Sequence, residues 1–335
     1  MPLLILTIIC TAAMLLMPSQ SIDGAKHGIS LCINAVIPSL FPFFVCSRMI
    51  VSSGIAQIIG RKTGKAFEFV FGINKDCAFS FIAGLLCGYP VGAKIVGDMY
   101  KNKQCTKSEA QRMLAFCNNS GPLFIIGTVG VGMLHSAKSG LILYIAHILS
   151  AIATGIIVRL IIPAKQKNCK VEFHTTILSG NFHDALTDSI KSMASVCGNI
   201  VFFSVIISAL NPILTSILPT LTGRGLASGI IEISTGISIL SKEGQLPVIG
   251  FLLAWSGISV IMQVDGIISP LGLSTPLFAT TKLIQGILGG MFTFLLVPLS
   301  LPDTVSYATN TTAIVITAAA VLTFLAIATE RIFVK

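Results

Sequence analysis

The chain has 335 residues, of which 53% are hydrophobic and 10% are charged. A soluble domain carries about 25% charged residues, so this composition excludes a soluble globular protein and predicts an all-α polytopic membrane protein. The formal net charge of +9 does not indicate nucleic-acid binding, because the basic residues lie in short segments between apolar stretches. The lipid bilayer is therefore the first expected partner, and no nucleic acid is expected.

Hydropathy predicts about eight transmembrane helices. In chain order they are Pro2–Met17, Ile29–Ser47, Ser108–Leu134, Gly140–Ile162, Ser189–Leu218, Leu246–Ile268, Pro276–Leu301 and Thr311–Thr329. The first lacks a basic start and a small-residue cleavage site, so we interpret it as an uncleaved anchor rather than a signal peptide. Pro18–Gly28 is expected to be an external loop, and Arg61–Lys75 a basic cytoplasmic loop.

Two polar segments are too short or too interrupted for an ordinary span, and we predict that each is a re-entrant hairpin. Cys77–Tyr100 lies between two basic segments, so it is expected to enter the membrane from the cytoplasm and return there. Gly88, Tyr89 and Pro90 supply turn chemistry at its centre. The alternative is a single tilted span. Gly225–Gly244 is the second predicted hairpin, centred on Ser234–Gly236.

The elements occur in the same order twice: a span, a polar hairpin, a broken span and a full span. The first copy begins outside and the second inside, which predicts two inverted-topology repeats. The expected domains are residues 1–28 (anchor helix and external loop), 29–162 (first repeat), 163–187 (cytoplasmic linker), 188–301 (second inverted repeat) and 302–335 (C-terminal helix and cytoplasmic tail).

The distribution of basic residues predicts a multi-pass membrane protein with both termini in the cytoplasm. All but four of the 22 lysines and arginines lie on the cytoplasmic side, or in segments entered from it. The four that do not are Lys26, Lys138, Arg224 and Lys242.

The strongest candidate site is the polar interruption of the span Ser108–Leu134. Asn118, Asn119 and Ser120 offer hydrogen-bond donors and acceptors, while Gly121 and Pro122 break the helical ladder. Helices broken near the bilayer centre form substrate sites in many transporters. The alternative is interhelical hydrogen bonding without a ligand.

Further candidates lie in the hairpins and in the second interruption, Ala254–Ser259. Glu232 is the acidic residue most deeply embedded in an apolar setting, and an intramembrane carboxylate is a functional candidate unless it lies in a loop. The other expected substrate-binding residues are Tyr89, Ser234, Thr235 and Ser256, and the expected gating or structural residues are Gly88, Pro90, Lys94, Pro122, Gly236 and Gly257. Lys94 faces either an anion or Asp98 at i+4. Asn199, Gln263 and Asp265 are weaker candidates.

Motifs for soluble-type catalysis are absent from the sequence. It contains no phosphate-binding GxxxxGK[ST], no GxSxG, no HExxH and no dinucleotide fingerprint. The nine cysteines include no CxxC pair and the five histidines form no metal-ligand spacing. We therefore expect no enzyme, no cofactor and no metal site.

The sequence CGYPVGAK at Cys87–Lys94, followed by FCNNSGPLFIIGTVG at Phe116–Gly130, resembles the YlbJ-type sporulation integral membrane proteins. NAVIPSLFPFF at Asn34–Phe44 fits as well. The resemblance implies a multi-pass protein of an endospore-forming bacterium, needed for spore formation. It also implies kinship with nucleoside-recognition (Gate) domains, found in nucleoside transporters and in the ferrous-iron transporter protein B. The glutamate associated with the hairpin and broken helix of nucleoside transporters is absent here, and Glu232 is the residue that could replace it.

Two functions follow from these observations. The first is a secondary transporter or channel that moves a small polar solute, nucleoside-like or other, with or without a coupling ion. The second is a non-transporting membrane scaffold for spore-envelope assembly. An intramembrane enzyme ranks below both, because no nucleophile–base set is visible. The sequence leaves open a homo-oligomer and a sporulation protein as partner.

Overall fold

The structure, a computed structural model, describes residues 11–12, 14–53, 55–162 and 182–300. Every element within these residues is a helix, which confirms the all-α prediction. The α-helices are α2 (Pro18–Leu31), α3 (Ile37–Ser52), α4 (Ile55–Phe71), α5 (Ala78–Cys87), α6 (Val91–Lys101), α7 (Lys107–Cys117), α8 (Ala137–Ile161), α9 (Phe182–Ile217), α10 (Leu221–Ile231), α11 (Ile233–Leu240), α12 (Leu246–Trp255), α13 (Gly257–Ile268) and α14 (Thr275–Ser300). The π-helices are η1 (Cys32–Val36) and η3 (Leu123–Met133), and the short 3-10 turns are η2 (Lys75–Cys77), η5 (Ser241–Glu243) and η6 (Ser269–Leu271).

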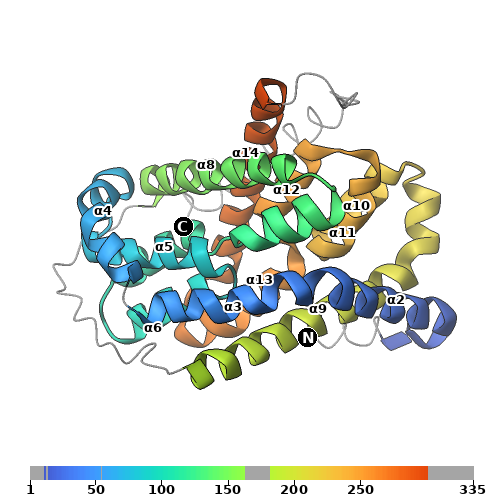
Figure 1. Cartoon of the computed structure of the whole chain (residues 1–335), viewed down its shortest axis with the longest axis horizontal. Coiled ribbons are helices and arrows are strands. Elements are labelled where there is room, and N and C mark those ends of the chain that lie inside the picture. Colours follow the sequence, from blue (N-terminus) through green and yellow to red (C-terminus); the bar gives the residue numbers. More distant parts are fainter. Residues whose placement is uncertain (1–10, 13, 54, 163–181, 301–335) are drawn as a thin grey trace, which may run out of the picture.

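The order helical hairpin, broken helix, long helix occurs twice in this fold. The first copy consists of α5 and α6, then α7 and η3, then α8, and the second of α10 and α11, then α12 and α13, then α14. The long helices α8 and α14 pack on each other, and α2 and α3 pack along α9 (Figure 1). The repeated order is therefore observed, whereas the opposite membrane orientation of the two copies stays a prediction.

Five helices are long and apolar enough to cross a membrane by length and composition, among the residues that the structure describes. They are Pro18–Ile50, Ala137–Ile161, Phe182–Ile217, Leu246–Leu271 and Thr275–Pro298, and each overlaps a predicted span. A sixth predicted span is divided between α7 and η3. Most of Pro2–Met17 and all of Thr311–Thr329 lie outside the described residues, as do the tail 302–335 and most of the linker. The count of eight is therefore untested.

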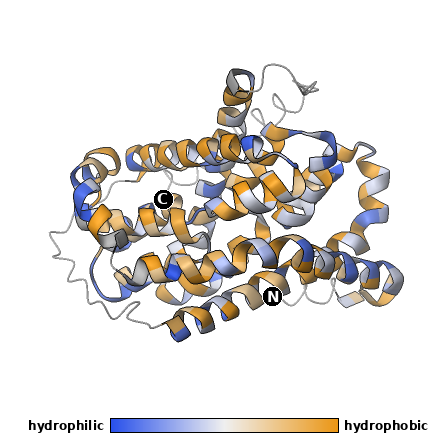
Figure 2. Cartoon of the chain, in the orientation of Figure 1, coloured by the Kyte–Doolittle hydropathy of each residue, from blue (hydrophilic) through white to orange (hydrophobic). Residues whose placement is uncertain are grey.

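The apolar surface agrees with a membrane setting. Hydrophobic residues cover most of α3, α8 and α9 (Figure 2). Exposed apolar side chains follow α8 at helical spacing, at Leu141, Ile145, Leu149, Ile156 and Leu160. Water would make this stripe unfavourable, whereas lipid tails solvate it. The chain is therefore a membrane protein.

The predicted external loop at Pro18–Gly28 is wrong, because these residues form α2. Pro18 stands at the start of this helix, where its missing N–H is not needed. Gly24 and Gly28 then bring α2 close to α9: a Cβ added to Gly24 would lie 2.7 Å from the Ser204 carbonyl oxygen. The polar residues of this segment, interpreted as a loop, instead occupy the exposed face of a helix.

The predicted basic loop at Arg61–Lys75 is also largely wrong, because α4 extends to Phe71. Its basic residues are exposed while Phe67 and Phe71 are buried against Phe116, with the Phe71 and Phe116 rings stacked 4.3 Å apart. Two arginines from other helices cap its C-terminal end. Arg112 donates to the Gly72 carbonyl at 3.1 Å and Arg159 to the Val70 carbonyl at 3.0 Å. The predicted linker is shorter as well, since α9 begins at Phe182.

Candidate functional site

The first hairpin packs its tip against the first break. The turn between α5 and α6 contains Gly88, Tyr89 and Pro90, as predicted, and Gly88 has φ +72°. A Cβ added to Gly88 would lie 3.0 Å from the backbone nitrogen of Gly121. The Cys117 carbonyl, at the end of α7, lies between the two arms of this hairpin. A Cβ atom added to Gly84 would be 1.8 Å from the Cys117 oxygen, and one added to Gly92 would be 2.0 Å from it. Glycine is required here by the close backbone approach.

The interruption Asn118–Pro122 is confirmed, and most of its polar groups have partners inside the protein, although the Asn118 side-chain nitrogen has none among the described residues. Asn118, Asn119 and Ser120 are fully buried. The Asn118 side chain accepts from the Ala93 N–H at the start of α6 (3.4 Å), and the Ser120 hydroxyl donates to the Leu253 carbonyl (3.2 Å). Pro122 begins η3. These contacts join the first break to the first hairpin and to α12, as the interhelical alternative predicts.

The turn of the second hairpin is at Glu232, two residues before the predicted centre. Glu232 ends α10 and caps α11, because its carboxylate accepts from the N–H groups of Ser234 (3.0 Å) and Thr235 (2.7 Å). A carboxylate is stabilised at a helix N-terminus by these donors and by the helix dipole. Ser234, Thr235 and Gly236 therefore form the first turn of α11 and not a hairpin tip.

The second break is confirmed at Ser256, which has φ +73° and is followed by Gly257 at φ +82°. It packs on the second hairpin as the first break packs on the first. A Cβ added to Gly257 would lie 3.2 Å from the Ile231 carbonyl oxygen, and the Trp255 ring N–H donates to the Ile230 carbonyl at 3.1 Å. The buried Ser256 hydroxyl has no hydrogen-bond partner among the described residues.

Both hairpins and the first break meet at one cavity with about 550 Å³ of empty space, part of it open. Its lining comes from α3, α9, α13 and the two hairpins. The lining residues are Leu40, Phe43, Phe44, Cys87, Gly88, Tyr89, Gly121, Phe124, Val196, Asn199, Ile200, Glu232, Ile233, Ser234, Ser259, Val260 and Gln263. Aromatic and aliphatic walls thus enclose a few polar groups, which is typical of small-molecule sites.

The structure brings together part of the predicted site. Of the predicted residues, those that line the cavity are Gly88, Tyr89, Gly121, Glu232 and Ser234. Those that do not line it are Pro90, Asn118, Asn119, Ser120, Pro122, Thr235, Gly236, Ser256 and Gly257. Lys94 is exposed, and no ion pair with Asp98 is found within the described part of the chain. Of the weaker candidates, Asn199 and Gln263 line the cavity and Asp265 does not.

Sequence reasoning missed a buried polar group on the long helices. His147 on α8 accepts from the Ser120 N–H at 3.2 Å, and Lys282 and Gln285 on α14 contact the first break. The signal was present, since Lys282 and Gln285 lie inside a predicted span, where ionisable groups are rare and functional. Lys282 is one of the basic residues from which the orientation is predicted, but a lysine buried within the protein carries no information about membrane sidedness.

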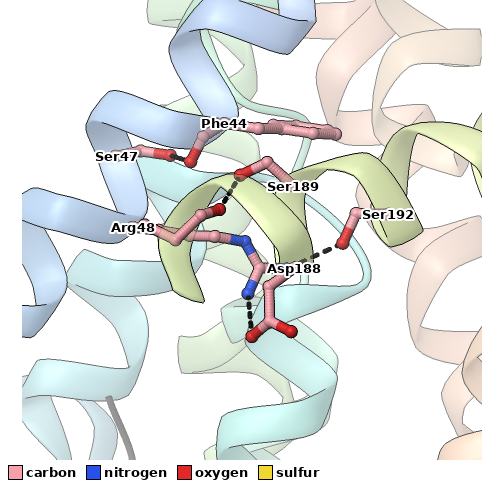
Figure 3. Close-up of polar contacts among 7 residues, drawn as sticks. Phe44, Ser47, Arg48, Asp188, Ser189 and Ser192 are labelled. Carbon is pink, nitrogen blue, oxygen red and sulfur yellow. Dashed lines mark hydrogen bonds and ion pairs between the residues drawn. The ribbon is translucent and has the colours of Figure 1, made fainter. Parts of the chain in front are cut away.

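A smaller cavity of about 220 Å³ of empty space lies beside the first and shares Phe44, Cys87 and Tyr89 with it. Its other side is formed by Arg48 on α3 and Ser192 on α9. The Arg48 guanidinium pairs with Asp188 at 3.2 Å and donates to the Ser192 hydroxyl at 2.7 Å (Figure 3). Arg48 is mostly buried whereas Asp188 is about half exposed, so this ion pair ties α3 to α9 next to the cavities.

The cavity lining contains few side chains of the types that ligate metals. Among the described residues, no group of three or more His, Cys, Asp or Glu side chains lies together as metal ligands would. Glu232 is the one carboxylate in the lining, and both of its oxygens already accept backbone hydrogen bonds.

Comparison with known proteins found one curated relative. The chain is 29% identical over 325 residues to the sporulation integral membrane protein YlbJ of Bacillus subtilis (strain 168), across 85% of this chain and 80% of the relative. The chain is YlbJ-like. No family model and no solved structure matches it. Kinship of this YlbJ-like chain with Gate domains stays a prediction.

Proposed function

We propose that this YlbJ-like protein is a transporter or channel for a small polar solute, and that the solute binds in the cavity between the two hairpins. One observation carries the proposal: the tip of the first hairpin, the first break and the turn of the second hairpin line the same cavity. Broken helices and hairpins that converge on one site are the architecture of alternating-access transporters. The solute would reach this site from either side of the cell membrane, and the protein would carry out no chemical reaction.

The chemistry of the lining favours a solute with hydrogen-bond donors. The polar lining includes the Glu232 carboxylate and the hydroxyls of Ser234 and Ser259. It also includes the Gln263 side-chain oxygen, which is buried and has no hydrogen-bond partner among the described residues. Among the described residues, no lysine, arginine or histidine lines the cavity. Since the described lining carries a carboxylate and no positive charge, we expect neutral or cationic solutes rather than anions. Tyr89 and Phe124, whose ring centroids are 6.5 Å apart, offer aromatic surface to a flat or cationic group. A nucleoside is one member of this class.

Uptake into proteoliposomes tests the proposal. The panel comprises uridine, adenosine, choline and putrescine, with lactate and phosphate as anionic comparisons. We expect uptake of at least one of the first four, and a reduction of about tenfold or more in Glu232→Gln, because a hydrogen bond to a charged group contributes about 1.5–3 kcal/mol. Glutamine keeps one acceptor for the cap of α11, so folding should survive.

The matched control is Gly198→Ala on α9, where an added Cβ would have nothing within 4 Å. Its uptake should equal that of the unmodified protein. Uptake of lactate or phosphate alone, or full activity of Glu232→Gln, would contradict the proposed site.

A scaffold for spore-envelope assembly is the second candidate. It is favoured because polar groups at the breaks and turns already bond within the protein: Glu232 caps α11, and Ser120 donates to the Leu253 carbonyl of α12. The name of the relative refers to sporulation, and we infer a role in sporulation under either candidate. Spore yield separates the two in a host that lacks its own YlbJ-like protein. Under the transport proposal Glu232→Gln fails to restore spores, whereas a scaffold would still restore them and would be recovered with a defined partner.

A further inference from the structure

Lys282 is a fully buried lysine on α14, and it points at the end of a helix. Its ammonium donates to the Asn118 backbone carbonyl at 3.2 Å and to the Gln285 side-chain oxygen at 2.7 Å. Both acceptors are neutral. Within the described part of the chain no carboxylate lies within 4 Å of this ammonium. A buried charge is unfavourable by several kcal/mol unless it is compensated, so these two oxygens must supply the compensation.

Asn118 is the C-terminal cap of α7, and this position explains the charge. The last carbonyls of a helix lack intrahelical donors and carry the negative end of the helix dipole. Two other helix ends near the cavity receive neutral donors instead. The Leu253 carbonyl of α12 accepts from the Ser120 hydroxyl, and the Ile230 carbonyl of α10 accepts from the Trp255 ring N–H. Of these three ends, α7 alone is met by a cation.

A network of hydrogen bonds holds the Lys282 ammonium in place. Gln285, itself fully buried, accepts from Lys282 and donates to the Asn119 side-chain oxygen at 2.9 Å. Asn119 then donates to the Phe116 carbonyl at 2.6 Å, which is another carbonyl of the last turn of α7. The nearby His147 uses Nε2 as an acceptor for the Ser120 N–H, so its ring is neutral and adds no second positive charge. Directly or through Gln285 and Asn119, this hydrogen-bond network connects Lys282 to the broken end of α7.

In transporters with broken helices, freed carbonyls and half-helix C-terminal ends bind the coupling ion. We infer that Lys282 is a built-in cation, whose ammonium occupies that position at the end of α7 and replaces a bound inorganic ion there. The break is then stable without Na⁺ or K⁺, and any coupling of solute movement to an ion must use another place. This inference does not depend on the proposed transport, because it concerns the stability of the break alone.

The experiment measures thermal unfolding of the purified full-length chain in detergent, with the salt as the variable. For the unmodified protein the midpoint should be the same in sodium, potassium and choline chloride. Lys282→Ala leaves the Asn118 carbonyl without its cation and opens a space for one. Its midpoint should fall by about 5–10 °C in choline chloride. Sodium or methylammonium chloride should restore at least half of that loss, whereas the bulky choline cation should not.

Gln285→Leu is the comparison variant, because it weakens the same network but keeps the ammonium. Its midpoint should fall without any recovery in sodium or methylammonium. Recovery of both variants alike, or of neither, would overturn the inference. If Lys282→Ala cannot be purified even with methylammonium present, the unmodified protein still tests the inference. An unfolding midpoint several degrees higher in sodium chloride than in choline chloride would show that the end of α7 needs a bound ion, and would overturn the inference.

Discussion

Replacing Gly84 with alanine is expected to lower the free energy of unfolding by about 3 kcal/mol or more. The added Cβ would lie 1.8 Å from the Cys117 carbonyl oxygen and 2.9 Å from its carbon. These are backbone atoms at the broken end of α7, so no flexible side chain can move aside, and overpacking of this kind typically costs about 1–3 kcal/mol or more. Titration of mixed micelles with a denaturing detergent measures the difference.

Two other helical glycines serve as matched controls for Gly84→Ala. Gly198 on α9 and Gly266 on α13 would each place an added Cβ where nothing lies within 4 Å. Alanine has the higher helix propensity, so both substitutions should be neutral or stabilising by up to about 1 kcal/mol. Equal effects at Gly84 and Gly198 would show that the first hairpin does not enclose the end of α7.

Replacing Gln285 with leucine is expected to lower the free energy of unfolding by about 3 kcal/mol. The substitution keeps the volume of the side chain but removes an acceptor from the Lys282 ammonium and a donor from Asn119. Both partners stay buried, and leaving buried polar or charged groups without partners costs more than the hydrogen bonds contributed. The same detergent titration measures the change.

Thr280→Val is the control for Gln285→Leu because it also replaces a polar side chain of α14 with an apolar one. The Thr280 hydroxyl bonds only within its own helix, to the Pro276 carbonyl at 2.9 Å. Its loss should cost less than about 1 kcal/mol. If Gln285→Leu is no more destabilising than Thr280→Val, the network around Lys282 does not hold the break.

Local chain signals predicted the interruptions of the helices well. Gly88 and Pro90 mark the first tip and Pro122 follows the first break, and each acts through its own backbone, so sequence alone sufficed. The turn of the second hairpin was displaced by two residues because Glu232 caps α11 with its own side chain. Glu232 is interpreted from the sequence only as an intramembrane carboxylate and not as the cap of a helix.

Elements that depend on partners far away in the sequence were predicted poorly. α2 was mistaken for a loop because its helix is stabilised by close packing of Gly24 and Gly28 on α9. The part of α4 from Arg61 to Phe71 was predicted as a loop because its charges hid an amphipathic pattern. Which candidates line the cavity could not be predicted either, since Asn118–Ser120 and Gly121 are neighbours in sequence but face different partners. Proximity in the chain does not specify which side chains share a cavity.

The central claim is that the cavity between the hairpins binds a solute through Glu232. Thermal unfolding of the purified chain, with uridine, adenosine, choline, putrescine, lactate or phosphate added, tests it most directly. We predict that at least one of the first four raises the midpoint of the unmodified protein, that lactate and phosphate do not, and that Glu232→Gln loses the shift relative to its own baseline. A panel with no effect on the unmodified protein, or an equal shift in Glu232→Gln, would contradict the claim.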